Sequence, residues 1–255
     1  MKHKMSTNTK NKKKEIFPGV EIHGLTLYLK KEKVLVIGDL HLGYEEELNS
    51  LGFLVPKFQY REIITYLKKI FSKIPSLEKI VINGDLKHEF GRISKQEWNE
   101  VLSFLDFLKS NVNEIFLIKG NHDTILGPLA ERKELKVLEY FYIANEKIYI
   151  CHGHKIPDDE NFERSKVVII AHDHPALGLR EGLRVEKVKC FLKGMWNEKI
   201  LIQIPSLNFV VEGSDISQEK MLSPFMNEIE NFDIYCIERE NLFYFGKVKH
   251  IYKHP

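Results

Sequence analysis

The chain has 255 residues, of which 43% are hydrophobic, so it can bury a full core and lies at the upper end of the size of one domain. Its Lys and Arg residues number 38 and its Asp and Glu residues 36, and the resulting net charge of +2 gives no overall field that would indicate a polyanionic partner. The 3 cysteines are widely spaced and suit neither a disulfide framework nor a zinc ribbon, which favours a reducing, cytoplasmic setting.

The N-terminus is rich in lysine, and no apolar stretch follows it, so no secretory signal is predicted. We expect residues 1–15 to form a disordered basic tail and residues 16–255 to form a single domain. No apolar run approaches the roughly 20 residues that a transmembrane helix needs, so no membrane partner is expected.

Short apolar runs rich in β-branched residues recur along the first two thirds of the chain, and each ends in a polar cluster. Runs of this length that do not alternate with polar residues predict strands buried on both faces. They cover residues 34–37, 80–82, 115–118, 148–150 and 167–170.

Helical spacing of apolar residues predicts helices at residues 56–74 and 94–110. Pro56 suits the first position of the former, and Ser94 to Glu97 is a candidate capping box for the latter. The alternation of strands and helices indicates an α/β fold around a largely parallel sheet.

Beyond residue 175 the pattern changes to strand-like runs, with one further helix predicted at residues 219–229. The runs cover residues 187–192, 199–204, 209–211, 234–237 and 242–245. They predict a second sheet stacked on the first, and therefore a β-sandwich flanked by helices.

The polar clusters combine carboxylates, imidazoles and one carboxamide. Loops that leave the carboxyl ends of strands in an open α/β sheet converge at one edge, so the clusters should meet there. Residues two apart in an extended segment, such as Asp39 and His41, point the same way and can reach one site. This donor set suits divalent manganese, iron, zinc or cobalt better than magnesium or calcium alone. The residues expected to meet are Asp39, His41, Asp85, Asn121, His122, Asp123, His152, His172 and His174.

Turn chemistry could explain any one of these clusters taken alone, but not all of them at successive strand ends. His152 and His154 are both candidate ligands in their cluster. His152 continues the face of Ile148 and Ile150, so we prefer it and expect His154 to face solvent or substrate.

Five sequence blocks resemble, in order, the signature of calcineurin-like metallophosphoesterases. They are Gly38-Asp39-Leu40-His41, Gly84-Asp85-Leu86-Lys87-His88, Gly120-Asn121-His122-Asp123, His152-Gly153-His154 and Ala171-His172-Asp173-His174. The resemblance covers residues 34–176 and implies a four-layer α/β/β/α sandwich with two stacked mixed sheets. Ala171 stands where the family usually has glycine, and we expect a local backbone adjustment there without loss of ligands. Residues 84–92, 96–98 and 204–208 further resemble archaeal phosphoesterases related to the SbcD nuclease subunit.

The resemblance also implies roles for individual residues. Asp39, His41 and His174 would hold a first metal ion, Asn121, His152 and His172 a second, and Asp85 would bridge the two. His122 would protonate the leaving oxygen, Asp123 would orient the His122 imidazole, and His88 would face the phosphate. Manganese is the first choice of metal, with iron, zinc, cobalt or nickel as alternatives.

The predicted function is that of a metal-dependent phosphoesterase acting on a phosphate ester, with nucleic acid or a nucleotide as the favoured substrate class. Two cations about 3.5 to 4 Å apart lower the pKa of a bridging water from about 15.7 to about 7, so that hydroxide forms at neutral pH and attacks phosphorus. The alternative is a catalytically silent scaffold on the same fold. The presence of every predicted ligand and of His122 favours the enzyme.

Overall fold

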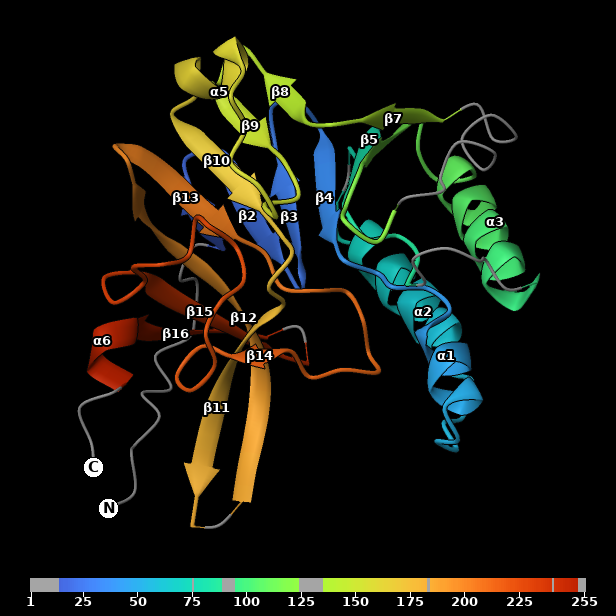
Figure 1. The fold of residues 1–255 in the computed structure, drawn as a ribbon. Helices are drawn as coiled ribbons and strands as arrows, with labels where there is room; N and C mark the ends of the chain where they lie inside the picture. Colours follow the sequence, from blue (N-terminus) through green and yellow to red (C-terminus); the bar gives the residue numbers. More distant parts are fainter. Residues whose placement is uncertain are drawn as a thin grey trace.

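The computed structural model describes residues 14–74, 76–88, 95–123, 135–182, 184–239 and 241–251, and the side chains of residues 95 and 96 are not among its details. Within these ranges the strands form two stacked mixed sheets flanked by helices, as predicted (Figure 1). The first strand begins at Glu15, which lies inside the segment predicted as a tail. Residues 1–13 of that tail lie outside the described residues.

In the described part of the chain the first sheet has seven strands, in the order β1-β2-β3-β4-β5-β6-β7. Neighbours are antiparallel from β1 to β4 and parallel from β4 to β7. The strands are β1 (Glu15–Phe17), β2 (Val20–His23), β3 (Thr26–Leu29), β4 (Val34–Gly38), β5 (Lys79–Asn83), β6 (Glu114–Ile118) and β7 (Lys136–Leu138).

The second sheet follows the order β14-β11-β12-β13-β10-β9-β8, and β15 pairs with β12 and β16. Its parallel pairs are β13 with β10, β10 with β9, and β11 with β14. The strands are β8 (Phe141–Ile143), β9 (Ile148–Ile150), β10 (Val167–Ile170), β11 (Pro175–Glu181), β12 (Arg184–Trp196), β13 (Lys199–Gln203), β14 (Ser214–Asp215), β15 (Asp233–Glu238) and β16 (Asn241–Lys247).

The longer helices lie beside the first sheet, where α2 turns Ile63, Leu67 and Ile70 into the core at helical spacing (Figure 1). The helices are α1 (Tyr44–Ser50), α2 (Gln59–Phe71), α3 (Lys95–Lys109), α5 (Glu160–Arg164) and α6 (Val248–Ile251). None of the described helices combines the length and the apolar character that spanning a bilayer requires.

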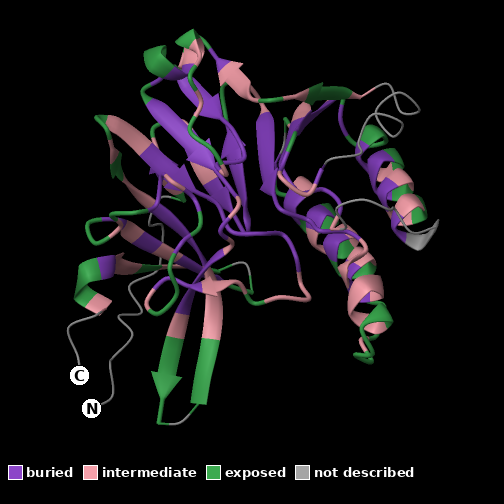
Figure 2. Cartoon of the chain, in the orientation of Figure 1, coloured by how far each residue is buried: buried purple, intermediate pink, exposed green. Residues whose placement is uncertain are grey.

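The two faces of the second sheet belong to different cores. Along β10, Val167 and Ile169 pack into the large core shared with the first sheet, whereas Val168 and Ile170 pack into a smaller core on the outer face. This follows from the period of two in a strand, and both faces can be apolar because both are covered. Figure 2 shows the buried strands at the centre and the exposed far end of the β11–β12 hairpin.

Several predicted elements differ from the structure. The helix predicted from Pro56 begins at Gln59, so Pro56 precedes it and is not its first residue. Residues 219–229 form turns and bends and not a helix, and residues 209–211 form no strand. Apolar residues in 219–229 face the outer core without helical backbone, since Met221, Phe225 and Met226 are buried there. Ser94, the start of the predicted capping box, lies outside the described residues.

Candidate metal centre

The loops that follow β4 and β5 run side by side and continue the parallel pairing of those strands. The backbone amides of Leu40 and His41 both donate to the carbonyl of Asp85, at 3.1 and 2.9 Å. The backbone therefore fixes where Asp39 and His41 lie relative to Asp85, before any side-chain contact is considered.

Three of the predicted clusters follow strands of the first sheet (β4, β5 and β6), and two follow strands of the second (β9 and β10). The expectation that all of them leave one sheet is therefore wrong, because the centre lies where the carboxyl ends of two sheets meet. Two contacts join the sheets there. The Leu207 amide donates to the Gly38 carbonyl at 3.0 Å, and the His172 amide donates to the Asp39 carboxylate at 3.0 Å.

The candidate ligands share an unusual backbone conformation. A positive φ is uncommon for residues other than glycine, and the strain it costs persists where the surrounding structure holds it, often at functional sites. Five of the seven candidate ligands have positive φ, namely Asp39 (27°), His41 (46°), Asp85 (38°), His172 (78°) and His174 (49°). Each side chain thus leaves its strand end in a direction that extended backbone would not give.

Two glycines allow the loops to approach the ligands. A Cβ atom at Gly84, whose φ is +83°, would lie 1.9 Å from Nδ1 of His152. A Cβ atom at Gly120 would lie 2.0 Å from Oδ1 of Asp85. Any larger residue at either position would displace a predicted ligand.

The first group of candidate ligands is Asp39, His41 and His174, the set that the resemblance assigns to one metal ion. The Nε2 atoms of His41 and His174 lie 3.1 Å apart, and Nε2 of His174 lies 3.5 Å from Oδ2 of Asp39. Asp39 is fully buried and His41 is 4% exposed, so the group is largely shielded from solvent.

The second group is Asp85, His152 and His172. Nε2 of His152 lies 3.2 Å from Nδ1 of His172, 3.3 Å from Oδ2 of Asp85 and 3.0 Å from Oδ1 of Asn121. Oδ2 of Asp85 also lies 3.8 Å from Nε2 of His41, so this carboxylate stands between the two groups. The structure thus brings together all seven residues predicted as metal ligands.

The predicted catalytic residues lie beside the first group, with contacts that differ from the predicted ones. Nδ1 of His122 bonds to the backbone carbonyl of His88 at 2.7 Å. The Asp123 carboxylate instead accepts backbone amides, at 3.0 Å from Gly120 and at 3.4 Å from Leu86. The His122 and His88 rings stack at 5.3 Å between centroids.

The donor groups fit a divalent cation. Two imidazole nitrogens that bind one ion at about 2.1 Å each, at an angle near 90°, lie about 3 Å apart. The Nε2 atoms of His41 and His174 have this separation. Oδ1 of Asp39 and Nδ1 of His152 are buried without a hydrogen-bond partner in the described structure, which is costly unless another group satisfies them.

Electrostatics at the centre favours positive charge. Burial alone would lower the pKa of His152, but the neighbouring Asp85 and Asp39 carboxylates outweigh it and raise this pKa to about 9. At His41, burial and the neighbouring His174 lower the pKa to about 3. The carboxylates that favour a proton on His152 would favour a metal cation in the same place.

His154, the second candidate of its cluster, is half-buried and approaches the second group from outside. Its ring centroid lies 5.3 Å from that of His152 and 6.2 Å from that of His172. The expectation that His154 faces solvent or substrate stays a prediction.

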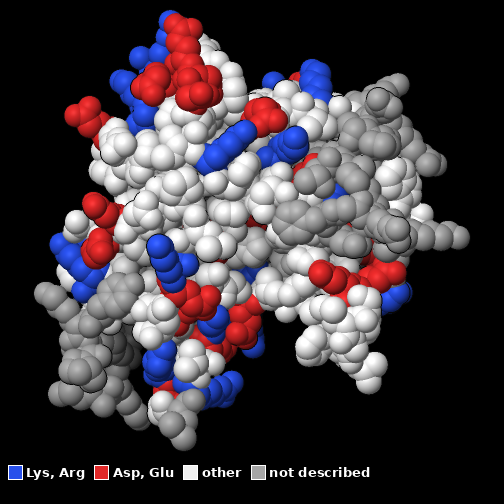
Figure 3. Space-filling view, in the orientation of Figure 1, with Lys and Arg blue, Asp and Glu red and all other residues white. Residues whose placement is uncertain are grey.

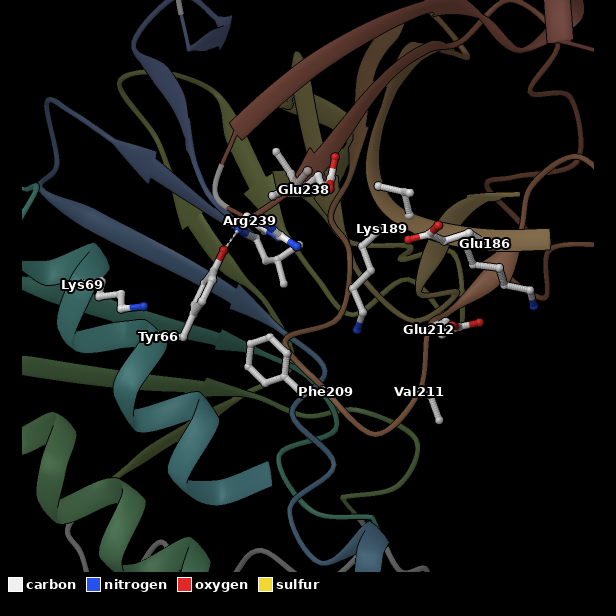
Figure 4. A pocket seen from close by; sticks show the side chains of 13 residues that line it. Tyr66, Lys69, Glu186, Lys189, Phe209, Val211, Glu212, Glu238 and Arg239 are labelled. Atoms are coloured by element: carbon white, nitrogen blue, oxygen red, sulfur yellow. Dashed lines mark hydrogen bonds between the residues drawn. The ribbon is translucent and has the colours of Figure 1, made fainter. Parts of the chain in front are cut away.

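A separate cavity of about 610 Å³ lies between α2, β12 and the loop that follows β13. Figure 4 shows Tyr66 and Phe209 on one wall, with the Lys189 side chain between Phe209 and Glu212. Lys189 donates to the Ser206 hydroxyl at 2.8 Å, and Ser206 pairs with the end of β4. None of the predicted site residues lines this cavity.

Acidic and basic side chains are interspersed on the face shown in Figure 3. This agrees with the near balance of charge in the sequence.

Two residues of α1 that sequence reasoning missed also reach the centre. Glu47 contacts Nε2 of His88, and the Tyr44 ring lies 4.1 Å from the His88 ring between centroids. The acidic run Glu45-Glu46-Glu47 just after a predicted ligand loop was the available signal, because acidic residues favour the first turn of a helix.

The fold is an α/β sandwich of two stacked mixed sheets. Carboxylates and imidazoles that follow the carboxyl ends of strands in both sheets form a centre suited to divalent cations. The chain belongs to the calcineurin-like phosphoesterase family, whose model matches residues 32–204. The family binds divalent metals, and membership indicates hydrolase activity. No curated protein matched the sequence.

Three solved structures are similar to this chain to different degrees, and the first of them shares its fold. The nuclease MPE of Pseudomonas putida has a TM-score of 0.62 at 17% identity, covering 88% of this chain and 94% of that chain. YfcE, a phosphoesterase from E. coli, has a TM-score of 0.41 at 13% identity, with coverage of 82% and 96%. Vps29 of Entamoeba histolytica in complex with zinc has a TM-score of 0.37 at 18% identity, with coverage of 83% and 96%.

Proposed function

We propose that this chain is a phosphoesterase that uses two divalent cations, with manganese as the first choice. Asp39, His41 and His174 hold one cation, and the other is held by Asn121, His152 and His172. Asp85 lies between them as the bridging ligand. One observation carries the proposal: donor atoms from five strand ends in two sheets converge, with Asp85 in contact with both groups at 3.3 and 3.8 Å.

When bound, the cations would supply an activated water as nucleophile and would neutralise charge on the phosphoryl oxygens. The side chains of this chain supply the remaining steps. His122 donates a proton to the leaving oxygen, and the contact of its Nδ1 with the His88 carbonyl fixes the orientation of its ring. A positioned general acid of this kind contributes roughly 10² to 10⁴ in rate.

The favoured substrate is a phosphodiester of nucleic acid or a nucleotide. The support is the fold shared with a protein described as a nuclease, together with the resemblance of residues 84–88 and 204–208 to SbcD-related phosphoesterases. Residues 89–92 of that resemblance lie outside the described residues. We keep the cytoplasm as the proposed location and residues 16–255 as the proposed single domain.

The test is hydrolysis of bis(p-nitrophenyl) phosphate by protein stripped of metal and then supplied with manganese. We expect turnover by the native chain and a loss of roughly 10²-fold or more in His122→Ala and in Asp85→Asn. Glu62→Ala, an exposed change on α2, serves as the control and should keep native activity. Equal inactivity of native and variant proteins with manganese, iron, zinc, cobalt and nickel would support the scaffold alternative.

A comparison of substrates then separates the candidate classes. Mononucleotides, cyclic nucleotides and single- and double-stranded DNA should be offered to the manganese-loaded native chain. Cleavage of DNA or a cyclic nucleotide supports a diesterase, whereas release of phosphate from mononucleotides alone would contradict it.

A further inference from the structure

Helix α1 brings a carboxylate to the centre from outside every motif described above. The Glu47 carboxylate contacts Nε2 of His88, and the Tyr44 ring covers the same imidazole at 4.1 Å. Both residues lie on α1, which begins three residues after His41. The His88 side chain is therefore held on one side by α1, while its other nitrogen faces the predicted ligands.

The positions of protons follow from these contacts. Nε2 of His88 faces a carboxylate, which can only accept, so this nitrogen carries the hydrogen. Nδ1 of His88 then has a free lone pair, and it lies 3.1 Å from Nδ1 of His41. The hydrogen of that bond must come from His41.

The consequence concerns the remaining nitrogen of His41. With its hydrogen on Nδ1, the neutral imidazole has its lone pair on Nε2. That atom lies 3.1 Å from Nε2 of His174 and 3.8 Å from Oδ2 of Asp85. The ring thus presents its metal-binding atom toward the other candidate ligands.

We propose that Glu47 and His88 are positioning residues for the first metal site, acting through His41. Glu47 orients His88, and His88 accepts the Nδ1 hydrogen of His41, which fixes both the tautomer and the direction of that ligand. This inference rests on the proposed metal-dependent function. It gives His88 a role in metal binding that is distinct from contact with a substrate phosphate.

Residues that orient a metal ligand in this way usually change metal affinity by about 10- to 100-fold when they are removed. The arrangement also predicts that the effects of Glu47 and His88 on metal affinity are not additive. Glu47 reaches His41 only through His88, so the two positions cannot contribute independently. The variant that carries both Glu47→Ala and His88→Ala should therefore have the same metal affinity as the single variant with the lower affinity.

The experiment measures manganese binding to the full chain, stripped with EDTA and dialysed, by isothermal titration calorimetry. The native chain should bind two ions. Glu47→Ala should weaken one site by about 10- to 100-fold and leave the other within about twofold. Glu47→Gln should lose less, since the amide oxygen can take the place of the carboxylate oxygen beside Nε2 of His88. His88→Ala and the double variant should match Glu47→Ala.

Glu62→Ala on α2 is the matched control, because it removes an exposed glutamate that belongs to none of the candidate ligand groups. Circular dichroism confirms that each variant is folded. Unchanged affinity of both sites in Glu47→Ala overturns the proposal and leaves the proposed function standing. A third ion that is lost in His88→Ala also overturns it, since His41, His88 and His122 form a group that would then bind metal directly. If the native chain binds no metal, both the positioning role and the proposed function fail.

Discussion

Asp123 is a buried carboxylate whose oxygens accept backbone amides from both ligand-bearing loops. It is 1% exposed, and it contacts the amides of Gly120, Leu86 and Lys87. Burial and the nearby Asp85 carboxylate raise its pKa from 3.8 to about 6. The Asp123 carboxylate therefore links the loops that follow β5 and β6 through hydrogen bonds to their backbone amides.

This raised pKa makes stability depend on pH in metal-free protein. The folded chain binds the Asp123 proton more tightly than the unfolded chain, so the stabilising contribution is complete below pH 4 and is lost as the pH rises through about 6. Relative to Asp123→Asn, native protein should lose about 2 kcal/mol of unfolding free energy between pH 4.5 and 7.5. Urea unfolding with EDTA present measures this difference.

Asp158→Asn is the control, because it changes an exposed carboxylate that should leave the pH dependence of native protein intact. A difference between native protein and Asp123→Asn that stays constant, or that widens as the pH rises, would contradict the prediction.

At the scale of single residues, the seven predicted ligands could be named from the sequence, whereas Tyr44 and Glu47 of α1 could not. Strand ends are readable from apolar runs, and the polar residues that follow them are few. The hydrogen-bond partners of those polar residues could not be predicted from the sequence. Asp123 follows His122 in the chain yet bonds to backbone amides, because the left-handed turn at Asp85 brings the loop after β5 over it.

The corner between α1 and α2 is held by a carboxylate that substitutes for a local cap. The residue before α2 is Phe58, whose side chain makes no capping hydrogen bond. Oε1 of Glu45 on α1 accepts the amides of Phe58 and Gln59 instead, at 2.7 and 2.8 Å. Gln59 in turn donates to the Leu40 carbonyl at 2.7 Å, next to the first ligand loop.

Removal of this cap should therefore destabilise the fold. We expect Glu45→Ala to lower the free energy of unfolding by about 1 to 3 kcal/mol, because the buried Gln59 amide and the partly buried Phe58 amide lose their acceptor. Urea denaturation of metal-free protein provides the value. Glu62→Ala, which removes an exposed acid from the first turn of α2, should stay within about 0.5 kcal/mol of native protein. Equal losses in both variants would refute a capping role for Glu45.

At the scale of elements, periodicity predicted the strands that carry the ligands and the two long helices. It did not predict α1, which has seven residues and few apolar ones, or β1 to β3 before the first ligand loop. Periodicity also could not assign β9 and β10 to the second sheet. Strands covered on both faces look alike in sequence whichever sheet they join, and only pairing partners far along the chain decide between the two.

At the scale of the whole molecule, the centre joins the two sheets. Asp39 and Asp85 follow strands of the first sheet, whereas His152 and His172 follow strands of the second. A cation held by both sets would link the sheets in the folded state alone, so it should stabilise the fold by mass action.

Manganese should accordingly raise the melting temperature. At a free concentration 100 times the dissociation constant, one site adds about 2.7 kcal/mol, which corresponds to about 5 to 10 °C for a chain of this size. Differential scanning fluorimetry with EDTA or with manganese measures the shift, and Asp85→Asn should show a smaller one. Identical melting temperatures in chelator and in manganese would argue against a cation between the sheets.

The same arrangement sets an order of events during synthesis. The predicted ligands extend from Asp39 to His174, and β10 gains its parallel neighbour β13 only after residue 203 has been made. A nascent chain that has left the ribosome as far as β6 can pair its first strands but lacks every imidazole of the second sheet. Binding of a cation by both groups would then be a late step of biogenesis, because a translation product that ends before residue 148 lacks His152, His172 and His174.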